Sequence, residues 1–274
     1  MRDGEHVGHL AAVITLAVAA LVSAQTPAPA PAQSTNASQV LSATREALGG
    51  ETRLNGVKSF VASGRTRRVS GANLVPLEFE ISCELPDKYA RRDEIPAQES
   101  GPTTIGFNGD ELIQLPVPPP PPIPAVPGRA GGPAQVDAAR RARAVGVKQD
   151  FVRLTLGMFA GSFSSYPLTF TYAGQAEAPQ GKADVIDVKG PANFALRFFV
   201  YRETHLPIMV SWETRAQGKP VENRIYYRDY REVDAVRFPF GLRRAVGADT
   251  VEETTFDRFR INAKIDPKKF EVRK

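Results

Sequence analysis

The sequence has 274 residues, of which 42% are hydrophobic and 24% are charged, and its formal net charge is +5. This length and composition exclude wholesale disorder and predict one globular domain with a sizeable core. The positive excess is spread along the chain in runs of mixed sign and no recognition motif accompanies it, so nucleic-acid binding is not expected.

The N-terminal part of the chain has the pattern of a secretion signal followed by a linker. Residues 10–22 form an apolar run, shorter than the roughly 20 residues that a membrane-spanning helix needs. The small residues Ser23-Ala24 then match a cleavage site. We predict a signal peptide over 1–24, a Pro/Ala linker over 25–35 and one folded domain over 36–274. No Cys directly follows the run to carry a lipid anchor, so the cleaved chain is expected to be soluble.

A helix is predicted to begin at Asn36 or Ser38, either of which is a favourable N-cap, and to run to Leu48. Spacings of three and four residues place several of its side chains on one inward face. They are Val40, Leu41, Thr44 and Leu48. The pair Gly49-Gly50 is expected to end the helix, because glycine readily takes the backbone conformation found there.

Two strands are predicted next, over Ser59–Val69 and Leu77–Leu85. Side chains alternate between the two faces of a strand, so the second strand has one apolar face. Its members are Leu77, Phe79, Ile81, Cys83 and Leu85. Cys83 is the only cysteine, and we expect it to pack as a small buried side chain without an internal disulfide.

Glutamates occupy the other face of this strand, at positions 78, 80 and 84. Paired carboxylates that act as a general acid and base are one interpretation of this row. We favour the other interpretation, in which the glutamates form cross-strand ion pairs with Arg65 and Arg67 of the preceding strand.

Three further strands, Asp87–Glu94, Thr103–Phe107 and Glu111–Leu115, continue the sheet, with a tight turn at 108–110. The pattern then stops at a Pro/Gly-rich loop over 116–134, which cannot enter a central strand. We interpret the loop as a linker or flap. The alternative is a polyproline ligand for a partner domain.

A long helix is predicted over Gln135–Ala160. Its apolar stripe consists of Val147, Phe151, Leu154 and Met158, and its first turns carry Arg140, Arg141 and Arg143. A basic amphipathic helix can make peripheral contact with a membrane. We favour a helix that docks on the sheet and keeps a solvated face.

The remaining strands follow one another with short connections, so we expect antiparallel neighbours. They cover 166–172, 183–189, 194–201, 206–213, 221–230, 236–246 and 250–261. The predicted fold is therefore mostly β (α+β): one curved antiparallel sheet of about ten or eleven strands, with an N-terminal helix and one long helix over its apolar face.

Three segments in the last third of the chain resemble a known family. They are Thr204-His205-Leu206-Pro207, residues 230–239 and residues 262–270. In these segments the chain resembles the bacterial periplasmic lipoprotein carriers, the LolA/LolB-like superfamily that includes the outer membrane lipoprotein-sorting proteins. The resemblance implies an incomplete β-barrel in the periplasm whose concave, apolar side holds acyl chains. Ala235 stands where the family often has glycine, so we do not expect the turn at 233–236 to take positive φ.

The residues that usually carry catalysis are scarce. Beyond the predicted signal peptide the only histidine is His205, which is expected in a turn, so a zinc site of Cys and His is excluded. Glu252 and Glu253 are adjacent on a strand and point to opposite faces, so they cannot act as an acid and base pair. A hydrolase would have to be built on His205 alone. We therefore predict no enzyme activity, no catalytic or metal-binding residues and no cofactor.

Apolar side chains, in contrast, are abundant on the predicted inner face. The first hypothesis is an exported carrier or sensor that holds the acyl chain of a lipid or lipoprotein, since an uncovered apolar face binds such a chain by the hydrophobic effect. The predicted lining is Phe79, Ile81, Phe170, Phe198, Trp212 and Phe238. The alternative is an interaction or regulatory module of the cell envelope, with a filled interior and a protein partner at the Pro-rich loop.

Overall fold

The computed structural model of the protein describes residues 36–96, 98, 101–118, 133–178 and 181–273. The predicted signal peptide over 1–24, the linker over 25–35 and most of the loop over 116–134 lie outside these residues. The domain boundaries and the role of the loop therefore stay predictions.

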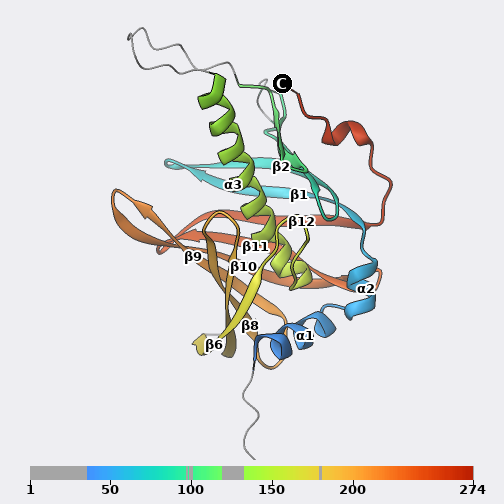
Figure 1. The fold of residues 1–274 in the computed structure, drawn as a ribbon, viewed down its shortest axis with the longest axis vertical. Coiled ribbons are helices and arrows are strands. Elements are labelled where there is room, and N and C mark those ends of the chain that lie inside the picture. Colours follow the sequence, from blue (N-terminus) through green and yellow to red (C-terminus); the bar gives the residue numbers. More distant parts are fainter. Residues whose placement is uncertain (1–35, 97, 99–100, 119–132, 179–180, 274) are drawn as a thin grey trace, which may run out of the picture. The chain divides into compact units, whose positions relative to one another are not determined.

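The described residues form one open antiparallel sheet of twelve strands (Figure 1). The strand order is β5-β4-β3-β2-β1-β12-β11-β10-β9-β8-β7-β6, and the two edge strands do not pair with each other. The predicted mostly β (α+β) fold with an incomplete barrel is confirmed, with twelve strands in place of the expected ten or eleven. The strands are β1 (Ser59–Ser70), β2 (Asn73–Glu84), β3 (Lys88–Glu94), β4 (Thr103–Asn108), β5 (Glu111–Leu115), β6 (Thr169–Ala178), β7 (Gly181–Gly190), β8 (Phe194–Tyr201), β9 (Pro207–Ala216), β10 (Lys219–Val233), β11 (Val236–Val246) and β12 (Asp249–Ile261).

Two helices precede the sheet. The first is α1 (Ala37–Ala47), and its N-cap is Asn36 as predicted, because the Asn36 side chain accepts a 2.9 Å hydrogen bond from the backbone N–H of Gln39. The Gln39 side chain accepts in return from the backbone N–H of Asn36, which completes a capping box. The second helix, α2 (Glu51–Gly56), was not predicted and is tied to α1 by an ion pair between Arg45 and Glu51.

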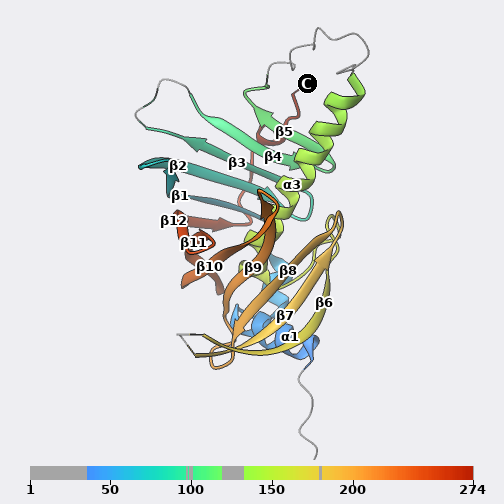
Figure 2. The ribbon, with the colours of Figure 1, turned by 90° about the vertical axis from the view of Figure 1, so that its left-hand side faces the viewer.

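The long helix α3 (Pro133–Phe159) lies along the concave side of the sheet and contacts β4, β5, β9 and β11 (Figures 1 and 2). Its first part is solvated, as predicted, since residues 135–143 are exposed apart from the half-buried Arg140. Its last part is enclosed, since residues 151–160 are buried except for the half-buried Leu154. A side chain at Gly157 would overlap the ring of Tyr227, so glycine lets the helix approach β10 closely.

The concave side of the sheet holds one large apolar cluster. Its largest fully buried side chains are aromatic, namely Phe60, Phe107, Phe198, Phe238 and Phe256. Cys83 is also fully buried in this cluster, as expected, and burial raises the pKa of its thiol well above the usual range. The helix α3 therefore packs against a continuous aromatic surface.

A second, smaller cluster lies on the outer side of the sheet. After β12 the chain crosses back to β3 and β4 and forms a short 3₁₀ helix there, η1 (Pro267–Phe270). Phe270 is 2% exposed and packs with Val61, Ala90, Ile113 and Ile265. The sequence did not predict that η1 packs on β3 and β4, because the alternation of residues within a strand does not reveal which distant segment will lie on that strand.

The ion pairs of β1 differ from the prediction. Arg65 pairs with Asp257 and Arg67 pairs with Glu253, both on β12, instead of with the glutamates of β2. Glu78 does lie opposite Arg65 in the register, but β1 has a strand on each side, and the acids of β12 take both arginines. Of the β2 glutamates, Glu80 pairs with Lys269 of η1.

The turn between β10 and β11 also differs from the prediction. Ala235 has a φ of 62° and Asp234 a φ of 49°, so the turn takes positive φ without a glycine. The end of α1 docks on this turn, where the backbone N–H of Arg237 donates a 2.7 Å hydrogen bond to the carbonyl of Leu48. A side chain at Gly49 would overlap the Ala235 carbonyl. These contacts hold Ala235 in a conformation that alanine alone disfavours.

Candidate ligand-binding site

The six residues predicted to line a cavity all belong to the concave side. Five of them are buried in the concave cluster, and the sixth, Phe170, is half-buried against its edge. Ring contacts tie two of them into the core: Phe79 lies 5.3 Å from Phe256, and Phe238 stacks 4.9 Å from Phe259. Their contact with a ligand stays a prediction.

A cavity of 220 Å³ lies between α3 and the concave side of the sheet. Val147 and Leu154 of α3 form one wall. The opposite wall comes from β2, β4, β10 and β11, through Ile81, Ile105, Ile225 and Leu242. The inner surface of the cavity is therefore mainly apolar. Of the six predicted lining residues, Ile81 alone lines this cavity.

Charged side chains also line this cavity. They are Arg68, Arg91, Asp93, Asp150, Arg244 and Glu252. Most are paired: Arg68 with Glu252 at 2.8 Å, and Arg91 with Asp93 at 2.7 Å. Arg244 is exposed and makes no ion pair among the described residues. Among the charged lining residues, Arg244 is therefore the cation that is available to bind an anionic group of a ligand.

A polar network supports one side of the cavity. The guanidinium of Arg91 donates a 3.2 Å hydrogen bond to the Thr66 hydroxyl, which lies 2.9 Å from the Thr254 hydroxyl. The same guanidinium lies 4.7 Å from the ring centroid of Phe79, within cation–π distance. Thr66 and Thr254 are buried, and their mutual hydrogen bond satisfies both hydroxyls.

Arg153 is a charged residue in the enclosed part of α3. It is 8% exposed, and burial lowers the pKa of its guanidinium. The guanidinium carbon lies 4.3 Å from the ring centroid of Trp212 and 5.2 Å from that of Phe194, and Nη1 donates a 2.8 Å hydrogen bond to Asp150. Nε is buried and has no hydrogen-bond partner among the residues that the structure describes.

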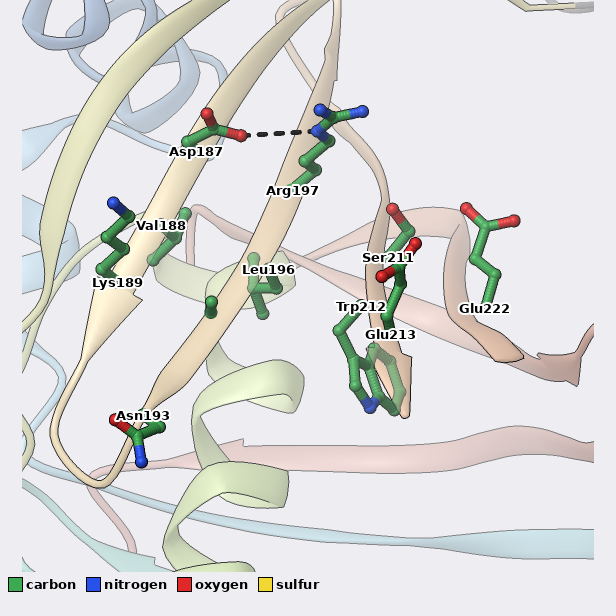
Figure 3. A pocket seen from close by; sticks show the side chains of 11 residues that line it. Asp187, Val188, Lys189, Asn193, Leu196, Arg197, Ser211, Trp212, Glu213 and Glu222 are labelled. Atoms are coloured by element: carbon green, nitrogen blue, oxygen red, sulfur yellow. Dashed lines mark ion pairs between the residues drawn. The ribbon is translucent and has the colours of Figure 1, made fainter. Parts of the chain in front are cut away.

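A second and larger cleft, of 630 Å³, lies where β8 and β9 separate (Figure 3). The side chains of Asp187, Arg197 and Glu222 point to the side away from α3, while Leu196 and Trp212 point towards the helix (Figure 3). Trp212 was predicted to line the acyl cavity. In the structure it lines this cleft and not the cavity beside α3, and its contact with an acyl chain stays a prediction.

Metal ligands and His205 are the remaining candidates for chemistry in the part of the chain that the structure describes. No group of three or more His, Cys, Asp or Glu side chains there is placed to hold a metal ion. His205 lies in the exposed turn after β8, as predicted. None of the described helices is both long enough and apolar enough to cross a bilayer.

Comparison with solved structures shows which known fold the chain shares. A LolA superfamily protein from Nitrosomonas europaea superposes with a TM-score of 0.53 at 11% sequence identity, over 86% of this chain and 97% of that chain. The protein has the LolA superfamily fold. The resemblance in the last third of the sequence is thus confirmed for the fold, and identity this low carries nothing about the ligand. No protein-family model and no curated protein matches the sequence.

Two further solved structures are similar with lower scores. A domain described as an outer membrane lipoprotein-sorting protein, from Vibrio parahaemolyticus, has a TM-score of 0.49 at 8% identity, over 84% of this chain and 95% of that chain. A DUF1329 family protein from Desulfovibrio piger has a TM-score of 0.45 at 6% identity, over 86% of this chain and 97% of that chain.

Within this LolA-like fold, the charged residues of the interior were missed by the sequence analysis. One signal was available for Arg153, which is the only charged residue in the otherwise uncharged segment 151–160. No comparable signal marks Arg91 or Arg244, because each lies next to another arginine, Arg92 or Arg243, and so reads as part of an ordinary charged surface.

Proposed function

We propose that the protein is an exported, periplasmic binding protein that holds the end of an acyl chain of a lipid or lipoprotein in the cavity between α3 and the sheet. The observation that carries the proposal is the composition of that cavity. Its walls carry apolar side chains on both the helix and the sheet side, and Arg244, which makes no ion pair with the described residues, lies beside them. This is the arrangement that an amphiphile with an anionic end requires.

The size of the cavity limits what it holds. Its volume of 220 Å³ is below the roughly 300–1,000 Å³ of pockets that enclose a whole small-molecule ligand. We therefore propose that the end of one acyl chain next to its anionic group is buried beside Arg244 and that the rest of the chain stays outside. Each buried methylene contributes about 0.8 kcal/mol, or roughly a fourfold gain in affinity. Affinity is expected to rise with chain length and then level off when the cavity is full.

Titration of the protein with fatty acids of increasing length, in competition with a dansyl-labelled fatty acid, tests this proposal. Leu154→Phe adds bulk in the cavity, since Leu154 lines it, and is expected to reduce the affinity at least about tenfold. Leu74→Phe is the matched control, because Leu74 is 64% exposed and lies outside the cavity. Equal affinities for the two variants would contradict the proposal.

The anionic end has its own test. Arg244→Glu is expected to weaken binding of a fatty acid more than binding of the corresponding alcohol, because only the acid carries a charge for Arg244. Arg260→Glu is the matched control: Arg260 is exposed and lies opposite Val61 in the register, on the outer face. A fatty alcohol that loses as much affinity as the acid would count against a role for Arg244.

The filled interior favours a second candidate function. The aromatic side chains of the concave cluster, Phe198 and Phe238 among them, are fully buried without a ligand. An envelope interaction or regulatory module without a transported ligand, and without enzyme activity, fits this observation. In that case no fatty acid of any length displaces the probe, and crosslinking from the Pro-rich loop captures an envelope protein in the exporting host.

A further inference from the structure

The cleft between β8 and β9 exists because these two strands pair over only part of their length. Their ladder runs from Arg197 and Ser211 to Val200 and Pro207. Beyond Arg197 and Ser211, residues 194–196 of β8 continue along β7, and residues 212–216 of β9 continue along β10. The sheet is therefore split at this place, and the cleft of 630 Å³ occupies the split (Figure 3). Its volume is in the range of sites for small organic molecules.

Arg153 lies on the α3 side of the split and is not itself a lining residue of the cleft, although Trp212, which lines the cleft, contacts it. Its guanidinium contacts one aromatic ring from each side, Phe194 at the start of β8 and Trp212 on β9. The backbone of α3 at this point is fixed, because the Tyr227 hydroxyl donates a hydrogen bond to the Arg153 carbonyl. The guanidinium is therefore held across the two strand segments that border the cleft.

One edge of this guanidinium has no hydrogen-bond acceptor. Nη1 donates to Asp150, whereas Nε is buried without a partner and Nη2 makes no hydrogen bond among the described residues. Nε and Nη2 together form the side-on edge of an arginine, which binds two oxygens of a carboxylate or phosphate group at once. A buried donor without an acceptor is rare in folded proteins, so an acceptor supplied by a ligand would complete the site.

The charges around the cleft restrict the ligand. Arg197 pairs with Asp187 at 3.5 Å, and Glu222 pairs with Arg224 at 3.5 Å. Lys189 and Glu213 remain, and neither makes an ion pair with the residues that the structure describes. The lysine adds to the attraction for an anion, while the glutamate opposes a group with several negative charges.

We propose that the β8–β9 cleft binds a singly charged oxyanion, a phosphodiester or a carboxylate of a small organic molecule or lipid head group, side-on to Arg153. This goes beyond the proposed function, because the cleft and the acyl cavity have no lining residue in common.

The chain itself provides the reporter for a test. Trp212 is the only tryptophan in the sequence, it lines the cleft, and its ring contacts Arg153, so its fluorescence reports on this region. Arg244 of the acyl cavity also lies 6.0 Å from the ring centroid, so the variants below are needed to assign a response to the cleft. We would titrate the full-length protein with glycerophosphoethanolamine, N-acetylglycine and phosphatidylglycerol vesicles. A saturable change of Trp212 emission is expected with at least one of them. A response to the soluble anions identifies the charged group as sufficient, and a response to vesicles alone identifies a lipid source.

Three variants decide the outcome. Arg153→Gln is expected to abolish the response. Lys189→Glu, at an exposed position, is expected to weaken it about tenfold. Lys182→Glu is the matched control, since Lys182 is exposed at the other end of β7 and does not line the cleft, and it is expected to bind within about twofold of the original protein.

Several results would overturn the proposal: no change of Trp212 emission with any of the three probes, normal binding by folded Arg153→Gln, or equal binding by Lys189→Glu and Lys182→Glu. If Arg153→Gln does not fold, the two lysine variants decide. Leu154→Phe fills the acyl cavity and is expected to leave the Trp212 response unchanged, so the two proposals can fail separately.

Discussion

The two faces of the sheet differ in how they are covered. The concave face carries one continuous cluster that reaches from α1 to β12 and encloses the end of α3. The outer face carries a small cluster of five buried residues, one of which is Phe270 of η1, and, beside it, exposed ion pairs such as that of Arg65 and Asp257. Burial scales with the apolar area removed from water, so most of the stability resides on the concave face. An incomplete barrel is therefore stabilised mainly by what fills it.

The largest effect is expected for Phe238→Ala. Phe238 is fully buried between Phe159 of α3 and Phe259 of β12, so truncation leaves a cavity at the centre of the concave cluster. We expect a loss of about 4 kcal/mol in the free energy of unfolding, measured by urea denaturation with circular dichroism. A loss below about 1 kcal/mol would show that the concave cluster repacks and is not the main source of stability.

A smaller effect is expected for Phe270→Ala on the outer face. Phe270 is as buried as the concave aromatics, but it belongs to a short segment near the C-terminal end. Such a segment can detach locally while the sheet stays folded. We expect a loss of about 2 kcal/mol, together with faster hydrogen exchange in residues 265–272 alone. Equal losses for Phe270→Ala and Phe238→Ala would remove the difference between the two faces.

The concave face is also expected to respond to alkaline pH. Tyr89 and Tyr227 are buried there, and burial raises the pKa of each phenol above its ordinary value of about 10. The folded protein therefore retains these protons while the unfolded chain releases them. Their contribution is complete below about pH 10 and is lost as the pH rises above it.

Tyr227→Phe tests this dependence. Removal of one such phenol is expected to reduce the loss of stability above about pH 10 by roughly 1.4 kcal/mol per pH unit. Urea unfolding at a series of alkaline pH values measures it. An unchanged slope would show that Tyr227 ionises normally and that the concave face is open to water.

The smallest effect is expected for Arg65→Ala on the outer face. The side chains of Arg65 and Asp257 are 69% and 47% exposed, and exposed ion pairs contribute little because water and salt screen them. We expect a loss of less than about 0.5 kcal/mol, which vanishes at high salt. A loss near that of Phe270→Ala would mean that the outer ion pairs matter as much as the outer cluster.

Much of the fold could be predicted, because a strand with one buried face shows an alternation of apolar and polar residues in its own sequence. The alternation of Phe194, Leu196, Phe198 and Val200 is reproduced as four buried residues between exposed or half-buried ones. The bounds of β11 match the predicted strand at both ends. The cap at Asn36 was also predicted, since its signal lies within a few residues of chain.

What could not be predicted depends on distant segments. The cover of η1 on β3 and β4, the pairing of Arg65 with β12 and the positive φ of Ala235 are all decided by neighbours far away in the sequence. The candidate sites also depend on segments that are distant in the sequence. The alternating pattern within β8 and β9 does not show where their pairing stops, so the split could not be predicted. Arg153 could not be recognised either, because its flanking rings, Phe194 and Trp212, come from distant strands.

The order of the strands has a consequence for how the chain folds. β5 and β6 follow each other across α3 yet lie at opposite edges of the sheet, while β1 and β12 pair in its middle. Phe60 pairs with Ile261, so the central ladder joins the two ends of the described chain. Closing so long a loop slows folding, whereas the hairpins on either side need only local turns. We therefore expect two separate meanders to form early and the seam between β1 and β12 to close last, as the rate-limiting step.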